Sequence, residues 1–415
     1  MIMKVMVVDG GARGQALGAK LAQEGNDVII SPGNPGNEDF AESTGIQPTD
    51  IIGQLRAAKR NNIELTIVGA DDPLAMGIVD AFEEELLAIF GPTKAQARIE
   101  WDRNFAKEIG RDRGIPMGPY AHFTDKKAAI EYTEGRSWPL YVKDNNLAQG
   151  KGAIKCENVE RFQTVLSGLN DEIIVEDYVG GPEASHHAFC DGRTQLSIPF
   201  LVRDHKQVGE GNTGLMTGGM GVVGPLPGYT QDEVGQLSET FVAPIVRELG
   251  FKGVLFVGLK GPKDYEKNLE WNARPGDPES QVFMRLMKSE LLPLIMACIE
   301  GGLDKVKKPE WHIGQSAVSL VLAAEGYPEE PRRGAIIEGL DDAAKIEGVQ
   351  VLHGGTKRSG RRLLTNGGRV LNLVARAESL EAALEQVYKA AAYIGFDGLS
   401  PLYRKDIGRT VLARS

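Results

Sequence analysis

The chain has 415 residues, of which 42% are hydrophobic and 25% are charged, and its formal net charge is −10. This balance is typical of a globular protein with a large core, and the length favours about three domains. The negative charge argues against bulk nucleic-acid binding. No apolar run approaches the roughly 18 residues that a membrane span needs, so we expect neither a membrane nor a nucleic-acid partner.

The cysteines and the N-terminus favour a reducing, cytoplasmic location. Cys156, Cys190 and Cys298 are scattered, with neither metal-ligand spacing nor a disulfide framework. The opening residues, MIMKVMVVDGG, are typical of a first strand, and no cleavage-type segment follows them. We expect a monomer or a weak homodimer.

The N-terminal region alternates predicted strands and helices, as a Rossmann-like domain does. Lys4–Val8 and Asp27–Ile30 are predicted strands on either side of a helix at Ala16–Ala22. Nicotinamide binding is disfavoured because Ser31, rather than an acidic residue, follows the second strand. The loop Pro32–Asn37 is at least a tight turn, and its backbone N–H groups could also cup a ligand.

The second region begins with a predicted helix, Ala95–Gly110, and continues with features that favour binding of nucleotide phosphates. Lys143 ends the predicted strand Trp138–Asp144, where its ammonium could reach phosphate oxygens. In the loop Ala148–Ala153, glycines flank Lys151, which lets backbone N–H groups approach an anion. The loop lacks the GxxxxGK[ST] spacing of a Walker loop. A surface lysine and a simple turn are the alternatives.

A predicted strand at Ile173–Tyr178 could offer its edge to an adenine ring, and Glu183 could accept hydrogen bonds from ribose hydroxyls. The alternative is that the strand and Glu183 are simply part of the solvent-exposed surface. A long glycine-rich loop is expected from residue 202 to residue 227, and such loops in compact domains are usually functional or disordered. Within it, His205 beside Lys206 favours a phosphate or carboxylate site.

The stretch Leu269–Gln281 carries the strongest chemical signal. It follows the apolar run Gly253–Leu259 and a polar turn, so it is predicted to be the second strand of a hairpin. Strands repeat every two residues, so Glu270, Asn272 and Arg274 are expected to share one face. A carboxylate and an amide oxygen suit a hard cation, and a guanidinium offers a fork to an anion. The alternative is a solvated polar face.

The remaining residues are predicted to be structural. Apolar residues favour a helix at Met287–Gly301 and a strand at Ala317–Ala323. An Asn-Gly turn inside Leu363–Ala375 favours a hairpin. Ser379 could cap a helix that ends before Gly395.

Taken in order, these blocks resemble an ATP-grasp ligase and, more narrowly, the phosphoribosylamine–glycine ligase family of purine biosynthesis. The blocks that carry the resemblance are FGPTK at 90–94, Lys143 with LAQGKG at 147–152, PEAS at 182–185, DHKQVGEGNTG at 204–214, TGGMG at 217–221, NARPGDPESQ at 272–281, and the late GGRVL and GFDG. They extend to Gly398, so the resemblance spans essentially the full chain.

The resemblance implies an α/β (mixed α+β) architecture of three domains. These are a Rossmann-like N-terminal domain at 1–101, an ATP-grasp domain at 102–310 with a lid at about 120–187, and a small C-terminal α+β domain at 311–415.

The resemblance also implies an acyl-phosphate mechanism, with ATP and Mg²⁺ or Mn²⁺ as cofactors. The carboxylate of glycine would attack the γ-phosphate of ATP, giving glycyl phosphate and ADP. The amine of 5-phosphoribosylamine would then attack the activated carbonyl, giving glycinamide ribonucleotide and phosphate. Catalysis would come mostly from positioning and charge neutralisation, and the glycine-rich loop would exclude water.

The candidate site residues fall into four groups. The expected catalytic residues are Lys143, Arg274, Asp204 and Lys206. The expected ATP-binding residues are Arg103, Lys143, Gly150, Lys151, Gly152, Glu176, Tyr178, Val179 and Glu183. The expected substrate-binding residues are Gly11, Arg13, Asn34, His205, Thr217, Gly218, Gly219, Arg274, Gly276, Asp277 and Pro278. The expected metal ligands are Glu270 and Asn272.

Several positions depart from the family's pattern, mostly in the region expected to help bind phosphoribosylamine. The family's GGREHAL turn is GARGQAL at 11–17, its Gly-Pro-Glu is Gly-Ala-Asp at 69–71, its Ser-Lys pair is Asp-Arg at 102–103, and its Asp-Gly is Asn-Asn at 145–146. Two alternatives therefore stay open. One is an ATP-grasp ligase for another amine or amino acid, and the other is a catalytically silent nucleotide-binding paralogue.

Overall fold

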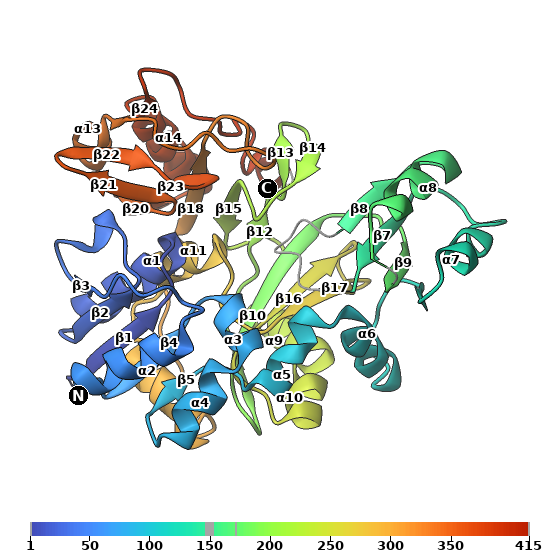
Figure 1. Cartoon of the computed structure of the whole chain (residues 1–415), viewed down its shortest axis with the longest axis horizontal. Helices are drawn as coiled ribbons and strands as arrows, with labels where there is room; N and C mark the ends of the chain where they lie inside the picture. Colours follow the sequence, from blue (N-terminus) through green and yellow to red (C-terminus); the bar gives the residue numbers. More distant parts are fainter. Residues whose placement is uncertain (1, 146–152, 171, 414–415) are drawn as a thin grey trace.

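The computed structural model describes residues 2–145, 153–170 and 172–413 (Figure 1). Its helices and strands confirm the mixed α/β class. Figure 1 shows an N-terminal unit in blue, a lid that projects to one side, a central sheet, and a C-terminal unit in orange and red. No helix within these described ranges is long and apolar enough to cross a membrane.

The N-terminal unit is a parallel sheet with helices on its faces. Its strand order is β3-β2-β1-β4-β5, the order of a doubly wound Rossmann-like sheet. The strands are β1 (Lys4–Val8), β2 (Asp27–Ser31), β3 (Glu42–Ser43), β4 (Leu65–Val68) and β5 (Ile89–Phe90). The helices are α1 (Ala12–Gln23), α2 (Ile51–Arg60), α3 (Asp71–Met76) and α4 (Ile78–Glu84), with a 3₁₀ turn, η1 (Pro35–Asn37).

Two short helices, α5 (Lys94–Trp101) and α6 (Arg103–Asp112), replace the single helix predicted at Ala95–Gly110. The break is at Asp102, whose side chain accepts a hydrogen bond from Phe105 N and so caps α6. This break turns the first residues of α6 toward the centre of the molecule.

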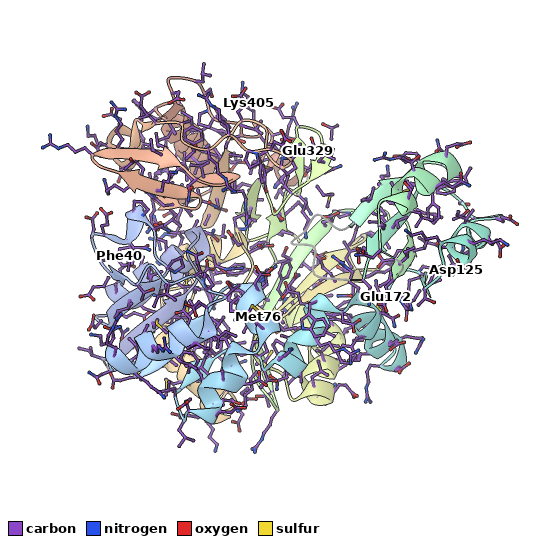
Figure 2. The ribbon with its side chains drawn as sticks, in the orientation of Figure 1. Phe40, Met76, Asp125, Glu172, Glu329 and Lys405 are labelled. Carbon is purple, nitrogen blue, oxygen red and sulfur yellow. The ribbon has the colours of Figure 1, made fainter. Side chains whose placement is uncertain are left out.

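The lid is a separate antiparallel sheet with its own small core. Its order is β6-β9-β7-β8, from β6 (Tyr120–Phe123), β7 (Leu140–Asp144), β8 (Ala153–Cys156) and β9 (Ile173–Asp177), with helices α7 (Lys126–Tyr132) and α8 (Val159–Ser167). Phe162 and Leu140 are fully buried in its core. Figure 2 labels Asp125 and Glu172 on this projecting part. The lid sheet ends at Asp177, before the expected boundary at residue 187.

The central sheet supplies the predicted hairpin. Its order is β11-β10-β16-β17, from β11 (Gln195–Ser197), β10 (Glu183–Asp191), β16 (Lys252–Lys260) and β17 (Lys267–Asn272). Antiparallel pairing of β16 with β17 confirms the hairpin, and Arg274 lies just beyond the strand. The helices around this sheet are α9 (Gln231–Phe241), α10 (Ala243–Leu249), α11 (Glu279–Leu286) and α12 (Leu292–Glu300). The helix predicted at Met287–Gly301 therefore begins later, at Leu292, and α11 was missed.

The C-terminal sheet includes strands from the predicted glycine-rich loop. Its order is β12-β15-β18-β23-β20, from β12 (Arg203–Asp204), β15 (Gly221–Gly224), β18 (Ser316–Ala323), β23 (Arg369–Ala377) and β20 (Val349–His353). A further hairpin, β13 (Gln207–Gly209) with β14 (Thr213–Met216), lies between β12 and β15 in the chain. The prediction of an unstructured loop at 202–227 was therefore wrong.

The Asn-Gly turn near residue 366 does not make the predicted hairpin. β22 (Arg362–Thr365) pairs with β21 (Thr356–Ser359), whereas β23 lies in the large sheet, so the turn joins two different sheets. The pair β19 (Ile337–Glu338) and β24 (Gly395–Phe396) and the helices α13 (Leu340–Ala344), α14 (Leu380–Ala391) and α15 (Arg409–Leu412) complete the unit. Ser379 caps α14 by accepting from Ala382 N at 3.2 Å, as predicted.

Candidate active site

Two adjoining cavities lie among the four units. The inner cavity is lined by residues that include Arg13, Glu100, Lys107, Arg274, Tyr327 and Arg369. The lid cavity is lined by residues that include Tyr141, Tyr178, Val179, Gln207, Asn212 and Thr410. Both cavities share Lys143, Glu176, Asp204, Lys206 and Glu270, so they meet at a cluster of charged side chains.

A buried carboxylate with two lysines stands where the lid meets α6. Lys143 Nζ lies 2.9 Å and Lys107 Nζ 3.1 Å from the two carboxylate oxygens of Glu176. Lys143 and Glu176 are diagonal neighbours on paired strands β7 and β9, which puts them on one face of the lid sheet. Burial raises the pKa of Glu176, but the two ammonium groups outweigh it and hold that pKa below its ordinary value. Two positive charges on one carboxylate leave a net positive site.

A second ion pair joins Glu270, on strand β17 of the central sheet, to Lys206, which lies between β12 and β13. Lys206 Nζ donates to Glu270 Oε1 at 2.9 Å. The Lys206 ammonium lowers the pKa of Glu270 well below its ordinary value, so the carboxylate is ionised. Gly258 faces Glu270 across the β16–β17 pair, and a Cβ at Gly258 would lie only 3.2 Å from Glu270 Cγ. A glycine at this position therefore leaves room for the carboxylate.

Asp204 completes the central cluster. It lies on β12 and lines both cavities beside Lys206. Burial raises the pKa of Asp204 well above its ordinary value, and the neighbouring Glu279 carboxylate raises it further. Glu279 Oε1 in turn accepts a hydrogen bond from Ser185 Oγ at 3.0 Å. The cluster therefore holds both an ionised carboxylate, Glu270, and a carboxyl group that burial favours in its protonated form.

Arg274 is held in place by two neighbours. Its Nη2 donates to Asn272 Oδ1 at 3.2 Å and lies 3.1 Å from a Glu100 carboxylate oxygen. Glu100 lies on α5, and its second oxygen accepts from Ala273 N at 2.8 Å. Burial raises the pKa of Glu100 to about 7, although the Arg274 guanidinium opposes this rise. These contacts fix the Arg274 fork at the wall of the inner cavity.

Two more arginines reach the inner cavity, Arg13 from the N-terminal unit and Arg369 from the C-terminal unit. Arg13 donates to Asp9 Oδ2 and to Pro275 O, the latter at 3.0 Å. Arg369, from β23, donates to Gly218 O at 2.6 Å and to Asp277 O and Oδ2, both at 2.8 Å. The C-terminal unit was predicted to be structural, but Arg369 brings it into the cavity wall.

The lid cavity has an aromatic wall. The Tyr141 and Tyr178 rings are stacked with centroids 6.3 Å apart. Lys260 Nζ lies over the Tyr178 ring at 5.3 Å and donates to Glu183 Oε1 at 2.9 Å. Tyr178, Val179 and Glu183 therefore come together as predicted residues of one cavity. Arg103 lines the inner cavity and donates to Asp144 O on β7.

Several predicted substrate-binding residues lie behind the cavity walls. His205 is the clearest case, because its Nδ1 contacts Gly221 O at 3.0 Å and its Nε2 accepts from Gly408 N at 3.1 Å. Asn34 donates to Gly10 O and His353 O, which ties the N-terminal unit to the C-terminal unit. Within the described part of the chain, neither cavity is lined by Gly11, Asn34, His205, Gly219, Gly276 or Pro278.

The other predicted substrate-binding residues do line the inner cavity: Arg13, Thr217, Gly218, Arg274 and Asp277. Two further predicted residues that do not line it make hydrogen bonds with nearby protein groups instead. Gly11 N donates to Asp9 Oδ1, and Gly276 N donates to His187 Nε2. The predicted ATP-binding residues Gly150, Lys151 and Gly152 lie outside the described residues.

The two expected metal ligands offer chemistry that suits a hard cation. Glu270 is an ionised carboxylate and Asn272 supplies an amide oxygen two residues along β17. Their oxygens accept from Lys206 and Arg274, so positive charge already collects where a cation would bind. The described residues contain no cluster of three or more His, Cys, Asp or Glu with metal-site geometry. Metal binding here would therefore need oxygens from a bound phosphate as well.

The inner cavity also contains residues that the sequence reasoning did not select: Asp71, Glu100, Lys107, Glu279, Tyr327 and Arg369. Lys107 follows Arg103 by four residues, so both lie on one face of α6, a spacing that could have identified it. Arg369 belongs to the GGRVL block. No local sequence pattern shows that this block reaches the cavity, because the position of Arg369 depends on the pairing of β23 with β18.

Comparisons with known proteins identify the family. Three family models match: "Phosphoribosylglycinamide synthetase, N domain" at residues 3–100, its "ATP-grasp (A) domain" at 101–280, and its "C domain" at 317–410. Proteins named phosphoribosylamine–glycine ligase from Vibrio parahaemolyticus and Brucella melitensis are 37% and 35% identical, each over 99% of this chain and 99% of the relative.

Solved structures agree. Phosphoribosylamine–glycine ligase from Thermotoga maritima matches with a TM-score of 0.82 at 27% identity, covering 97% of this chain and 99% of that chain. N5-carboxyaminoimidazole ribonucleotide synthetase from Thermotoga maritima, with a TM-score of 0.65 at 17% identity over 95% of this chain and 99% of that chain, shares the fold. The chain belongs to the phosphoribosylamine–glycine ligase family, whose members are ATP-grasp proteins.

Proposed function

We propose that this protein is an ATP-dependent ligase that joins glycine to 5-phosphoribosylamine, giving glycinamide ribonucleotide, ADP and phosphate in purine biosynthesis. The observation that carries the proposal is the meeting of two cavities at one charged cluster, Lys143–Glu176 and Lys206–Glu270. Phosphoryl transfer needs this arrangement, because the nucleotide and the acceptor must approach a common point from two sides.

The lid cavity is the proposed nucleotide site. Tyr141 and Tyr178 offer an aromatic wall for the adenine ring. Val179 lies just beyond β9, whose residues pair with β6 on one side and with β7 on the other, so the predicted free strand edge is absent at β9 itself. Glu183 accepts a hydrogen bond from Lys260 in this structure. On nucleotide binding it would accept hydrogen bonds from the ribose hydroxyls in place of Lys260. Lys143 and Lys107 would lie beside the phosphates, since Glu176 balances only one of their two charges.

Glu270 and Asn272 would hold Mg²⁺ or Mn²⁺ together with phosphate oxygens of the nucleotide. A bound cation would neutralise charge on the transferring phosphoryl group. The protein's own contribution is to present an ionised carboxylate and an amide oxygen on a strand that the β16–β17 pairing holds rigidly.

The inner cavity is the proposed site for glycine and phosphoribosylamine. Arg274 offers its guanidinium to a carboxylate or phosphate, and Arg13 and Arg369, which both lie near Asp277, add positive charge. The glycine carboxylate oxygen would bond to the γ-phosphorus as ADP leaves. The amine nitrogen would then bond to the carbonyl carbon, lose a proton and displace phosphate. Lys206 and Arg274 would stabilise the negative charge that develops in both steps.

A ligase for another amine is the second candidate, because the family's pattern is altered at positions 12, 14, 15, 70 and 71. Of these, only Asp71 is among the described residues that line the inner cavity. Gln15 instead bridges the N-terminal and C-terminal units, donating to Gly36 O at 2.8 Å and accepting from His353 N at 2.6 Å. The altered positions are therefore mostly structural, which favours the first candidate.

We also propose the three-domain division at 1–101, 102–310 and 311–415, which is supported by the matched ranges 3–100, 101–280 and 317–410. A cytoplasmic location and a monomer or weak homodimer are proposed as well. The three cysteines support a reducing compartment, since all are buried free thiols.

The testing experiment measures ADP release from Mg·ATP and glycine, with and without 5-phosphoribosylamine generated in situ. Release that depends on both substrates, with glycinamide ribonucleotide as product, is the expected result. ATP binding without stimulation by phosphoribosylamine would instead favour the second candidate. Binding without any turnover, across a panel of amines and amino acids, would indicate a silent paralogue.

A further inference from the structure

A buried arginine near the C-terminus holds the hairpin that forms one wall of the lid cavity. Arg404 is 2% exposed and follows β24 in the chain. Its Nη1 donates to Gln207 O at 3.0 Å and to Asn212 Oδ1 at 2.9 Å, which lie at the start and the tip of the β13–β14 hairpin. Its Nε and Nη2 form a fork on the two oxygens of Asp406, at 2.8 and 2.7 Å. One guanidinium therefore joins the hairpin to the C-terminal segment.

Asp406 extends the same attachment. Its Oδ2 also accepts from Gly211 N at 2.8 Å, next to the hairpin tip. Lys405 N donates to Glu210 Oε1 at 3.3 Å, and Figure 2 labels Lys405 in the C-terminal unit. Gly408 N donates to His205 Nε2 just before the hairpin. The segment from Arg404 to Gly408 thus contacts residues before, at the start of, and at the tip of the hairpin.

The hairpin and the segment both reach the lid cavity. Gln207, Asn212 and Met216 line this cavity from the hairpin, and Thr410 lines it from α15. The hairpin itself is short and largely exposed, with Leu215 46% exposed. Two strands of this size are marginally stable alone in water, so their position depends on what holds them. In the described residues around the tip, Arg404 and Asp406 supply the charged contacts that do so.

We propose that Arg404, with Asp406, is a positioning residue for the nucleotide site. It fixes the β13–β14 hairpin as the wall of the lid cavity that faces the lid, so affinity for ATP depends on a residue of the C-terminal unit. This inference rests on the proposed function only in taking the lid cavity as the ATP site. It requires neither glycine nor phosphoribosylamine to be the substrate.

Arg404→Lys and Asp406→Asn test the inference, with Arg332→Lys as the matched control. A lysine keeps the charge but cannot bond Gln207, Asn212 and Asp406 together, because it lacks the planar fork. Asp406→Asn keeps the shape of the side chain, so it carries the test if Arg404→Lys does not fold. Arg332 forms an exposed pair with Asp397 at 2.6 Å in the same unit, and it lines neither cavity.

Two readouts are measured on the full-length protein. The first is the KM for Mg·ATP, or its Kd measured without the other substrates, against the KM for glycine. The second is hydrogen–deuterium exchange of the hairpin amides, residues 207–216, with and without Mg²⁺ and a non-hydrolysable ATP analogue. Strands β18 and β23 serve as internal references for global stability.

We expect the KM or Kd for ATP to rise about tenfold in Arg404→Lys and Asp406→Asn, as loss of one or two charged hydrogen bonds predicts. The KM for glycine and the Arg332→Lys control should change less than about twofold on the same scale. Hairpin amides should exchange faster in both variants, while β18 and β23 keep their protection.

Unchanged ATP affinity in both variants would overturn the proposal, as would hairpin amides that the nucleotide leaves unprotected in the wild-type protein. If exchange rises equally in the hairpin and in β18 and β23, Arg404 is a general stabilising residue and the proposal is wrong. A wild-type protein that binds ATP but does not join glycine to phosphoribosylamine would refute the proposed function, while the Kd for ATP and the hairpin exchange would still test this proposal.

Discussion

The Arg274 guanidinium lies 3.1 Å from a Glu100 carboxylate oxygen, and both side chains line the inner cavity. The two residues come from different regions of the chain, α5 and the end of β17. Their pairing means that one buried ion pair joins α5, the helix after the N-terminal unit, to the end of the strand that bears the proposed metal ligands. Burial of this carboxylate has a measurable consequence for stability.

Glu100→Gln should change how stability depends on pH. Burial raises the pKa of Glu100 to about 7, so the folded protein binds a proton more tightly than the unfolded chain does. Its contribution to stability is therefore present at low pH and is lost as pH rises through 7. Between about pH 5 and pH 8, the free energy of unfolding should fall about 2 kcal/mol more in wild type than in the variant. Urea titrations at several pH values measure this, and parallel curves would contradict it.

Glu270→Gln should nearly abolish turnover while the fold stays intact. The substitution keeps the shape but removes the ionised oxygen that would bind the metal, so we expect kcat/KM to fall at least about a hundredfold. Initial rates across a Mg²⁺ titration measure the effect, and a chelator should abolish wild-type activity. Glu266→Gln is the matched control. Glu266 is buried nearby, where it accepts from Tyr229 Oη at 2.7 Å, and it lines neither cavity. Full activity in Glu270→Gln would remove it from the metal site.

Arg369→Lys should weaken use of the substrates of the inner cavity. Arg369 joins Gly218 O to Asp277 through three hydrogen bonds, and a lysine cannot satisfy both with a fixed planar geometry. We expect kcat/KM for phosphoribosylamine to fall about tenfold to a hundredfold, with a smaller change in the KM for ATP. Arg362→Lys is the control, because Arg362 is the exposed first residue of β22 and lines neither cavity. Equal kinetics in the two variants would show that the C-terminal unit has only a structural role here.

Gly14→Ala should destabilise the protein because α1 packs tightly on the end of β1. A Cβ at Gly14 would lie 2.1 Å from Asp9 O and 2.8 Å from Asp9 Cβ. We expect a loss of about 3 kcal/mol in the free energy of unfolding, measured by urea denaturation. Gly235→Ala, in α9, is the control, because its Cβ would meet nothing within 4 Å. That change should stabilise the helix by about 0.5–1 kcal/mol. A neutral Gly14→Ala would mean that β1 and α1 can separate at little cost.

The sequence predicted those parts of the fold in which local pattern and final environment agree. Strands β1, β2 and β4 of the N-terminal unit are largely buried and are visible as apolar runs such as Lys4–Val8. The β16–β17 hairpin was predictable because its partners are adjacent in the chain. The charged residues Lys143, Glu176, Lys206 and Glu270, which the sequence singled out, line the two cavities, and their roles stay predictions. Each lies at or near a recognisable strand or motif.

The missed features depend on partners that lie far along the chain. Gly221–Gly224 is rich in glycine and resembles a loop, yet it pairs with β18, whose residues follow almost a quarter of the chain later. Arg369 reaches the inner cavity only because β23 pairs with β18. His205 was expected to face a ligand, but burial lowers its pKa to about 4 and backbone groups occupy both ring nitrogens. No pattern around His205 distinguishes these two environments.

The large C-terminal sheet has a consequence for how the chain is made. β15 lies in the region that matches the ATP-grasp (A) domain, but its neighbour β18 is synthesised much later, and β18 pairs with β23 on its other side. A ribosome releasing the chain from its N-terminus would complete the N-terminal unit and the lid early. The large C-terminal sheet would be completed only after β18 and β23 had been synthesised. A chain that is cut short would therefore carry β15 as an exposed, unpaired edge, a template for aggregation. Pairing of β15 therefore depends on strands that are synthesised much later than β15 itself.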